Sequence, residues 1–502
     1  MTPTAQKFSQ AAATKSVDLQ HRAIIQKNIA SYDIAVTRSR DRFSDWHNAR
    51  SKAAAIKWDT INHLDRYLEE FERNVLANGG HVHWAEDAEQ ARQIVLTLAR
   101  QHGVRKVVKA KSMTTEEIHL NDALAAAGIQ PVETDLGEYI CQLRNEPPYH
   151  IVTPVMHLSK ADIGKLFHER FDTPPDAPAE ELTMVARQQL RQDFLTADMG
   201  ITGANFLIAD SGMIALTTNE GNGRLSVSLP RIHVAIAGIE KLIPRLSDLG
   251  LFWPVLCASG TGQALTSYST LVGGPRRDGE VDGPTEFHVI LLDNGRTKLL
   301  ANPEMRDVLH FIRCGACLNT CPVYKTIGGH TYATTYQGPI GSVLTPRLRG
   351  AEEWSHLAFA SSLCGSCTDV CPVRIDLHHH LLHNRRDATA RKFDNPVQRL
   401  AFKIWLWTLQ SPARYAVAGT MARFGLRLGL GNYIANPWTA TRDLPEAPRQ
   451  SFRNWWETVG QASRLSPLNP PTGGTPVQHQ PTSNPKDSGP RTLDSGLPPH
   501  HP

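Results

Sequence analysis

The 502-residue chain carries a formal net charge of only +4, and its basic residues are spread along its whole length. Because nucleic-acid-binding proteins gather basic residues into patches or stripes, this distribution excludes that class. The length exceeds what one hydrophobic core usually serves, so we expect a globular protein with several domains.

The opening residues 1–25 lack the basic start, the continuous apolar run and the small-residue cleavage site of a secretory signal. We therefore expect a cytoplasmic protein. Six of the eight cysteines lie in two short groups between residues 314 and 371, which in a reducing compartment indicates metal ligation rather than disulfide bonds. Cys141 and Cys257 stand alone, and we expect them to be small buried side chains.

Residues 1–75 are predicted to form a helical N-terminal region, because apolar residues such as Leu64, Leu68 and Phe71 recur at helical spacing. Residues 76–300 alternate between helical and strand-like segments, which is typical of an α/β domain with a parallel sheet. Helices are expected at 91–103 and 116–128, and strands or extended segments at 104–110, 129–135, 204–210, 213–218, 225–230, 231–238 and 287–293.

Two segments of this α/β region are candidate ligand sites. The first is a turn-rich run between two predicted strands, whose glycines allow close backbone approach and whose arginine can pair with a carboxylate or phosphate: Asn219, Glu220, Gly221, Asn222, Gly223 and Arg224. An ordinary hairpin turn with an exposed arginine is the alternative. The second is Lys109, Lys111 and Ser112, which precede a helix with Thr115 as its expected cap.

No Walker-type glycine run and no complete G-x-G-x-x-G follows a predicted strand, so neither ATP hydrolysis nor dinucleotide binding is supported. A different pattern begins at residue 301, where residues 301–392 are expected to form a cluster domain. Residues 301–312 are predicted to be a capped helix that leads into the first of two Cys-x-x-Cys-x-x-x-Cys-Pro motifs.

Paired motifs of this kind indicate two iron–sulfur clusters. In two-cluster ferredoxins the cysteine before the proline ligates the other cluster. We therefore expect the ligand sets Cys314, Cys317 and Cys371 for one cluster and Cys321, Cys364 and Cys367 for the other. A zinc site built from the two C-x-x-C pairs is the alternative, but it leaves Cys321 and Cys371 without a role.

Each motif lacks the first cysteine of the usual ferredoxin frame, because Phe311 and Ser361 stand at those positions. We expect [4Fe-4S] clusters, with [3Fe-4S] as the alternative for either site, or a water or unusual ligand on one iron. Ser361 could offer an oxygen ligand, whereas Phe311 cannot ligate. Among the histidines that follow the second motif, His379 and His383 could share a metal ion, and the alternative is an ordinary solvated or packing role.

Residues 393–460 are predicted to be a helical C-terminal segment. It is too broken and too charged for a membrane span, but aromatic residues such as Trp405 and Trp407 lie among basic ones. This pattern suits peripheral contact with a bilayer on the cytoplasmic face, or a groove on a partner subunit. Residues 461–502 are rich in Pro, Gly, Ser and Thr, and we expect a disordered tail.

Long segments of the chain strongly resemble the lactate utilization protein B family. They are VKAKSMTTEEIHLNDALAAAGIQPVETDLGEYI, GITGANFLIADSGMIALTTNEGNGR, IRCGACLNTCPVYKTIGGHTY, GPIGSVL and SSLCGSCTDVCPVRIDL. The likeness extends from about residue 20 to about residue 460, and the cluster segment is also similar to the helical two-cluster ferredoxin domain of heterodisulfide reductase. In the lactate utilization protein B family a cysteine usually stands where this chain has Phe311, whereas serine does occur at position 361.

The resemblance implies a multidomain α/β plus α protein, with a lactate-utilization-type α/β domain, a helical two-cluster ferredoxin-like domain and a helical C-terminal segment. It implies an electron-transfer subunit of a system that oxidises L-lactate to pyruvate and passes electrons toward the respiratory chain. The expected partners are other subunits of that complex, electron donor or acceptor proteins and, indirectly, the quinone pool. The rival hypothesis is an oxidoreductase whose α/β domain itself binds a hydroxy acid.

Overall fold

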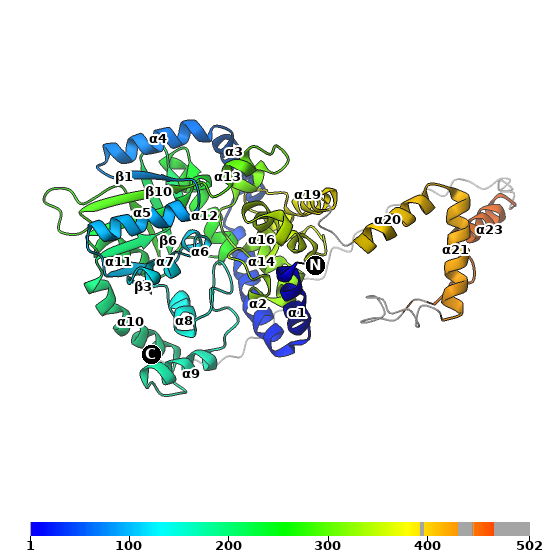
Figure 1. The fold of residues 1–502 in the computed structure, drawn as a ribbon, viewed down its shortest axis with the longest axis horizontal. Coiled ribbons are helices and arrows are strands. Elements are labelled where there is room, and N and C mark those ends of the chain that lie inside the picture. The colour runs from blue at the N-terminus through cyan, green and yellow to red at the C-terminus, as the bar shows by residue number, and fades with distance from the viewer. Residues whose placement is uncertain (1, 392–395, 430–443, 445, 466–502) are drawn as a thin grey trace, which may run out of the picture. The chain divides into compact units, whose positions relative to one another are not determined.

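The computed structural model describes residues 2–391, 396–429, 444 and 446–465. The chain divides into two compact units, Met1–Gln398 and Arg399–Pro502. The first unit holds an α/β body and the cysteine-rich helical segment (Figure 1). Among the described helices, none is both long enough and apolar enough to cross a bilayer.

The α/β body is built on a six-stranded parallel sheet, which confirms the predicted architecture. The strand order is β1-β10-β7-β4-β2-β3, where the strands are β1 (His81–Ala85), β2 (Lys106–Lys109), β3 (Gln130–Glu133), β4 (Met199–Thr202), β7 (Ile232–Gly238) and β10 (Glu286–Leu292). The chain moves outward from β2 to β3 and then continues with β4 on the other side of β2. The strand order therefore reverses between β2 and β4.

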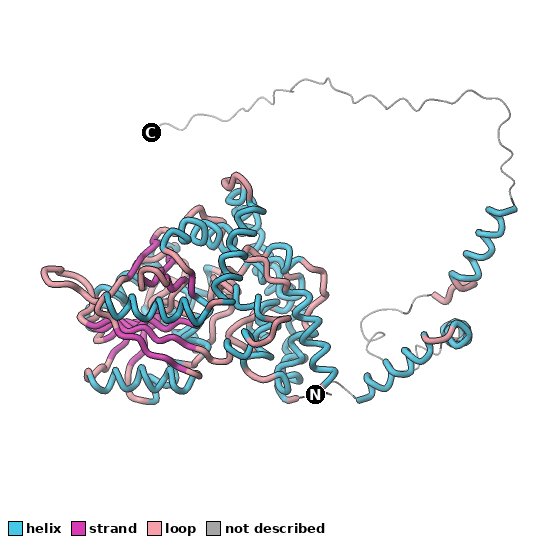
Figure 2. Tube along the Cα trace, turned by 90° about the horizontal axis from the view of Figure 1, so that it is seen from above, coloured by secondary structure: helices cyan, strands magenta, loops and turns pink. Residues whose placement is uncertain are grey.

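Both faces of this sheet are covered, so its central strands are apolar throughout. Alternate residues of β7 enter different cores. Val234 and Ile236 pack with α5 (Ala88–Gln101) and α7 (Leu120–Ala126), whereas Ala235 packs with α4 (Leu64–Ala77) and a second sheet. Figure 2 shows the strands as a layer with helices on both sides.

The second sheet has four strands in the order β8-β5-β6-β9: β5 (Phe206–Ile208), β6 (Met213–Thr218), β8 (Leu242–Ile243) and β9 (Tyr268–Val272). Near β2 and β3, a further core joins three helices, α8 (Leu136–Arg144), α9 (Lys160–Phe171) and α10 (Ala179–Thr196). Cys141 and Cys257 are buried, as predicted.

Residues 225–230 are not the strand that their composition predicted. They belong largely to helix α11 (Asn222–Ser228), so the hairpin alternative for residues 219–224 is also wrong. The cause is tertiary: a Cβ at Gly200 of β4 would lie 1.7 Å from the Ser226 carbonyl oxygen, so only glycine lets this helix backbone pack directly on the sheet. Close packing of this kind overrides local β-propensity.

Residues 301–312 form only a short 3-10 helix, η3 (Arg306–His310), instead of the predicted capped α-helix. The Asn302 side chain accepts a hydrogen bond from the Glu304 backbone N–H at 3.0 Å, which stabilises a turn around Pro303. This turn leaves too few residues for a regular α-helix before the first cysteine.

The cysteine-rich segment and the N-terminal helices share one core, although they lie far apart in the sequence. Ile25, Ile29 and Ala53 pack in the same cluster as Cys314 and Cys317. The N-terminal helices are α1 (Pro3–Val17), α2 (Leu19–Arg40) and α3 (Trp46–Asn62). Helices of the cysteine-rich segment include α14 (Ala316–Thr320), α15 (Pro322–Ile327), α16 (Gly338–Leu348), α17 (Ala351–Trp354), α18 (Ser366–Val370) and α19 (Leu377–Ala390).

The remaining elements of the first unit are short, apart from α12: α6 (Met113–Glu117), η1 (Ile239–Lys241), η2 (Leu246–Asp248), α12 (Leu249–Gly260), α13 (Arg296–Leu300), η4 (His330–Tyr332) and η5 (Ser355–Phe359). The described helices after α19 are α20 (Pro396–Leu409), α21 (Pro412–Arg427) and α23 (Phe452–Leu465). The predicted tail from residue 461 thus begins inside α23, and its part at 466–502 lies outside the described residues.

Candidate functional site

The two cysteine motifs have the same unusual backbone conformation. Each first cysteine follows a residue with positive φ, Arg313 (61°) or Leu363 (55°), and precedes a glycine with positive φ, Gly315 (78°) or Gly365 (82°). Residues other than glycine seldom adopt this region, and such strain is typically stored at functional sites. The repeated strain therefore marks both motifs as binding loops.

A single turn of helix follows each glycine, α14 in the first motif and α18 in the second, and these two helices pack against each other. Each helix ends at the cysteine that precedes the proline. Cys321 (φ −74°, ψ 119°) and Cys371 (φ −63°, ψ 117°) both adopt extended backbone. The motifs are thus two copies of one local structure, which turns its third cysteine away from the first two.

The thiols fall into two groups that cross between the motifs. We call Cys314, Cys317 and Cys371 the first cysteine group, and Cys321, Cys364 and Cys367 the second cysteine group. Within the first group, Cys314 interacts electrostatically with Cys371, and Cys317 with both. Within the second, Cys321 interacts with Cys364, and Cys367 with both. The groups adjoin, because Cys317 also interacts with Cys367.

The surroundings of the thiols suit metal-bound thiolates. All but Cys364 are buried. Burial raises the pKa of the Cys314 thiol to about 12 and that of Cys367 to about 11, so these thiols need a bound cation to be ionised. Backbone N–H groups nevertheless point at the sulfur atoms, as in the 3.2 Å hydrogen bond from Ile375 N–H to Cys371 Sγ.

This donor set fits two iron–sulfur clusters. It supplies two adjoining groups of three thiols, with N–H groups directed at the sulfur atoms, and such hydrogen bonds tune cluster potentials. A zinc site that uses only the two C-x-x-C pairs would leave Cys321 and Cys371 within the same groups but without a metal. The fold therefore favours clusters over zinc.

Phe311 and Ser361 differ in how they could affect the clusters. The Phe311 ring is buried, packs in a T-shaped arrangement with Tyr336 (ring centroids 5.7 Å apart) and has the Arg313 guanidinium over its face. Ser361 is partly exposed, and its hydroxyl accepts a hydrogen bond from the Leu363 backbone N–H at 3.1 Å. Serine thus stabilises the loop before the second motif, and phenylalanine packs the loop before the first.

Arginines from the N-terminal helices lie near the first cysteine group. The buried Arg50 guanidinium donates to the Cys371 carbonyl oxygen from Nε at 3.0 Å and from Nη2 at 2.8 Å. Arg40 interacts electrostatically with Cys314. Positive charge near a cluster favours its reduced, more negative form, so these arginines are expected to raise the reduction potential.

A cavity of about 470 Å³ opens at the carboxyl ends of β2, β3, β4 and β7. Its wall includes Lys111 and Ser112 after β2, and Gly203 after β4. The strand order reverses at this point, and open α/β sheets bind their ligands there. Cys314 of the first cysteine group also lines the cavity, so a molecule bound in it would lie against a cluster ligand.

Two buried polar side chains in the cavity wall lack hydrogen-bond partners among the described residues. Neither the amide nitrogen nor the amide oxygen of Asn222 has a hydrogen-bond partner. The side-chain amino group of Lys241, a residue that is 3% exposed, makes no direct hydrogen bond there, although Glu240 attracts it electrostatically. Burial and the nearby Arg313 lower the pKa of Lys241 well below its usual value. Unpaired buried polar groups are costly, so both side chains are available for a bound molecule.

The residues of the first predicted ligand segment divide between the cavity and the surface. Asn219, Glu220, Asn222 and Gly223 line the cavity, whereas Arg224 is exposed and stacks on Tyr268. The Glu220 carboxyl group accepts a hydrogen bond from the Leu136 N–H at 3.1 Å. Although part of the side chain is exposed, desolvation and the neighbouring Asp135 raise the pKa of Glu220 to about 7.

The second predicted segment is also divided. Lys111 and Ser112 line the cavity, whereas Lys109 is buried in an ion pair with Glu133 at 2.5 Å. The expected cap was wrong by three residues, because Ser112 accepts the N–H of Thr115 and is itself the N-cap of α6.

His379 and His383 have different neighbours. His379 Nδ1 lies 2.6 Å from Asp376 Oδ2, whereas the His383 ring contacts that of His380. In the described part of the chain, no group of three or more candidate metal ligands contains both histidines.

Lys241 and Arg313 were not singled out in the sequence. Lys241 comes three residues after the buried strand β7, at the sheet edge where α/β proteins bind their ligands. This position in the sequence could have indicated that Lys241 lines a ligand site. Arg313 directly precedes Cys314, but its role depends on Glu240, which is distant in sequence and lies 2.8 Å from it. No local pattern could have revealed that pairing.

The fold and the two cysteine groups define a class, an iron–sulfur protein that carries an α/β body with a cavity at its sheet edge. Comparison with protein families agrees: residues 68–292 match the LUD domain, residues 311–375 a 4Fe-4S dicluster domain, and residues 389–461 the C-terminal domain of lactate utilisation protein B. The cofactor prediction of iron–sulfur clusters of the 4Fe-4S kind is thereby confirmed.

The chain belongs to the lactate utilization protein B family. It is 44% identical to lactate utilization protein B of Shouchella clausii, over 82% of this chain and 88% of that protein. It is 43% identical to lactate utilization protein B of Bacillus velezensis, over 83% and 89% respectively. An uncharacterized electron transport protein of Escherichia coli, YkgF, is 41% identical over 86% of this chain and 94% of its own length.

Proposed function

We propose that this chain is the electron-transfer subunit of a multi-protein system that oxidises L-lactate to pyruvate and passes the electrons toward the respiratory chain. The observation that carries the proposal is the pair of adjoining cysteine groups within one core, which would place two one-electron carriers side by side. Membership of the lactate utilization protein B family supports the choice of substrate.

In this role the first cysteine group would hold one cluster and the second cysteine group the other. Electron paramagnetic resonance of the as-isolated and reduced protein should reveal two clusters and separate three-iron from four-iron forms. Cys371→Ser should then alter the signal of the cluster held by Cys314, and Cys321→Ser that of the cluster held by Cys364. If each substitution instead disturbed only the cluster of its own motif, the crossed assignment would be wrong.

Contact with a membrane or a partner subunit is proposed for α20 and α21. Large apolar side chains of α20 are exposed, including Phe402 (58%), Trp405 (57%) and Trp407 (59%). Arg414 lies over the Trp407 ring at 4.4 Å, which places positive charge beside the aromatic surface. Flotation with anionic liposomes should recover the full chain but not a variant without residues 400–430. Equal flotation of the two would exclude the contact with a membrane.

A second candidate function is oxidation of a hydroxy acid by this chain itself, and the cavity beside Cys314 favours it. Lys241 and Asn222 could bind a carboxylate, and an electron donor in this cavity would be in contact with a cluster ligand. The isolated, cluster-loaded chain should then be bleached by L-lactate without partner proteins, and Lys241→Met should slow the bleaching. Absence of bleaching would leave the electron-transfer role and reject the enzymatic one.

A further inference from the structure

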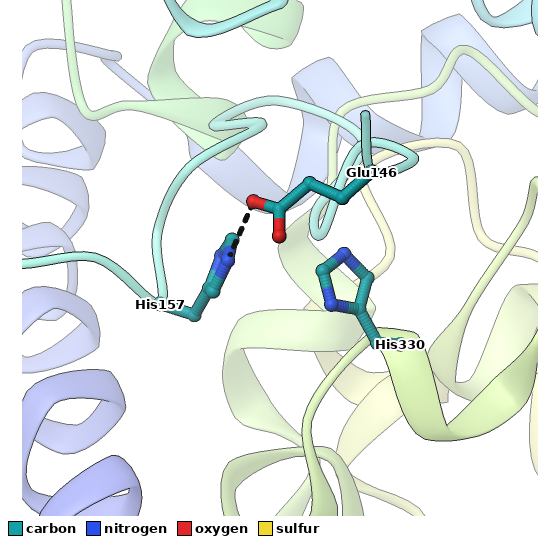
Figure 3. A group of neighbouring side chains, drawn as sticks. All are labelled: Glu146, His157 and His330. Carbon is teal, nitrogen blue, oxygen red and sulfur yellow. Dashed lines mark hydrogen bonds and ion pairs between the residues drawn. The ribbon is translucent and has the colours of Figure 1, made fainter. Parts of the chain in front are cut away.

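Three metal-binding side chains meet where the α/β body touches the cysteine-rich segment (Figure 3). Glu146 follows α8, His157 precedes α9, and His330 begins η4. Each offers a donor atom, and these atoms all lie within 4.8 Å of one another. Glu146 and His157 lie on the loop between α8 and α9, so the group joins this loop to the cysteine-rich segment.

The hydrogen bond that His330 makes leaves its other ring nitrogen free. His330 Nε2 lies 2.8 Å from the Pro147 carbonyl oxygen and donates its proton to it, so the lone pair of this neutral imidazole is on Nδ1. Metal-binding histidines usually donate their other ring N–H to a carbonyl or carboxylate in this way. Burial lowers the pKa of His330.

Glu146 is ionised and has one free oxygen. Its Oε1 accepts hydrogen bonds from His157 Nε2 at 3.0 Å and from Arg144 Nε at 2.9 Å. Burial raises the pKa of Glu146, but these two partners outweigh it and lower the pKa to about 2. Among the described residues, no donor reaches Oε2. The carboxylate can therefore keep Arg144 on Oε1 and offer Oε2 to a metal ion.

The aromatic side chain of Tyr149 holds both imidazoles in place. Its ring stacks on His157 with centroids 4.6 Å apart and meets His330 edge-on at 5.0 Å. Tyr149 is itself buried, and its hydroxyl is hydrogen-bonded to His21 Nε2 at 2.8 Å. A Cβ at Gly329 would lie 1.7 Å from the Tyr149 carbonyl oxygen, so the two backbones are in close contact. The ligand geometry is thus pre-organised.

We propose that Glu146, His157 and His330 bind a divalent transition-metal ion, and that the donor atoms favour Zn²⁺. The ion would link the α8–α9 loop to the cysteine-rich segment. Two imidazoles and one carboxylate with a water as fourth ligand form an established type of zinc site. His157 would bind the ion through Nε2 and carry its ring proton on Nδ1, so the ion would take the place of the hydrogen bond between Nε2–H and Glu146. This inference goes beyond electron transfer, because Ile151 to Val155 of the same loop line the cavity. The metal would stiffen one wall of the cavity.

Equilibrium dialysis of the cluster-loaded protein against Zn²⁺, followed by elemental analysis, tests the proposal. The wild-type protein should bind about one zinc ion without losing its cluster iron. His330→Gln or Glu146→Gln should weaken zinc binding about tenfold or more. His379→Gln is the matched control. It alters an exposed histidine–aspartate pair within the other candidate ligand group, Asp376, His378 and His379, and it should leave zinc binding unchanged.

Iron and sulfide contents are measured in every sample, so that zinc bound by empty cysteine groups is recognised. Hydrogen exchange supplies a second readout: Zn²⁺ should slow exchange in the loop between α8 and α9 in the wild type but not in His330→Gln. If His330→Gln loses cluster iron, two other measurements test the proposal. They are zinc binding by Glu146→Gln and the effect of Zn²⁺ on hydrogen exchange in the wild-type protein. Wild-type protein that binds no zinc, or variants that bind it equally well, would overturn the proposal.

Discussion

At the scale of single residues, the protein is least ordinary at position 311. A residue here would be the first ligand of the usual ferredoxin frame, but the phenylalanine is 7% exposed and packs with Tyr336 and Arg313. This position thus has a packed aromatic ring instead of a thiolate ligand. Loss of a negative ligand raises the reduction potential of a cluster. We therefore expect Phe311 to make the cluster at the first cysteine group a better electron acceptor.

Phe311→Cys should add a fourth thiolate to the first cysteine group. We expect a lower reduction potential for this cluster and loss of any three-iron signal, measured by a redox titration followed by paramagnetic resonance. The lost packing should cost about 3 kcal/mol of the free energy of unfolding. Ser361→Cys is the control at the partly exposed equivalent position. An unchanged first cluster in Phe311→Cys would mean that this side chain does not reach the iron.

The buried His233 predicts a specific sensitivity to acid. Burial lowers the pKa of this histidine from 6.5 to about 3 in the folded chain. The unfolded chain therefore binds a proton first, and stability is complete above about pH 6.5 and is lost progressively as the pH falls toward 3. Between pH 8 and pH 5 this residue should account for about 2 kcal/mol of lost stability.

His233→Phe removes that titration and can retain the stacking on Phe287. Urea unfolding of the two proteins at pH 8 and pH 5, followed by fluorescence, measures the effect. The variant should show a shallower decline in unfolding free energy with falling pH. Parallel declines would mean that His233 does not contribute.

At the scale of secondary-structure elements, helix α11 contributes a polar side chain to the cavity wall. Helix α11 contains most of the strand-like run at residues 225–230, and it presents Asn222 to the cavity because its backbone rests on β4 at Gly200. The close approach depends on the missing side chain. A single methyl group at this point would push the helix away from the sheet.

Gly200→Ala should therefore destabilise the protein by about 3 kcal/mol, a cost typical of severe overpacking. Gly250→Ala is the matched control. It is an exposed residue in the first turn of α12, where an added methyl group would meet no atom within 4 Å, and it should be neutral or stabilising by about 1 kcal/mol. Urea midpoints of both variants test this pair. Equal midpoints would show that α11 can shift without cost.

At the scale of the first unit, a buried charge network joins the α/β body to the first cysteine motif. Glu240, which follows β7, contacts both Arg296 and Arg313, and Tyr336 donates to Glu117 at 2.7 Å. Arg313 is the residue before Cys314, so the network positions the strained entry to the motif. The α/β body thus supports the cluster segment directly.

Glu240→Gln should destabilise the protein by about 3 to 5 kcal/mol, because it leaves buried arginines without a charged partner. Cluster bleaching and loss of helical circular dichroism should both occur at lower urea concentrations. Glu304→Gln, which breaks an exposed pair with Arg386, is the control and should leave both midpoints unchanged. If the urea midpoint of cluster bleaching shifts while the midpoint of the dichroism change does not, the effect is confined to the cluster segment.

The sequence by itself determined the parallel sheet, the location of the cysteine motifs and the iron–sulfur chemistry. These features are local: buried parallel strands are continuous apolar runs such as β7 and β10, and a cluster loop needs cysteines at short spacing. The sequence also located one side of the cavity, because residues 219–223 carry glycines and polar groups in one short run.

Only the tertiary structure decided which partners these local features acquire. The strand-like run at residues 225–230 became largely helical because Gly200 admits its backbone, and Lys241 lines the cavity because of where β7 ends. Arg313 and Glu240, like Glu146 and His330, are far apart in sequence and meet only when separate elements pack. Such long-range pairings depend on how elements pack in three dimensions, and no local spacing encodes them.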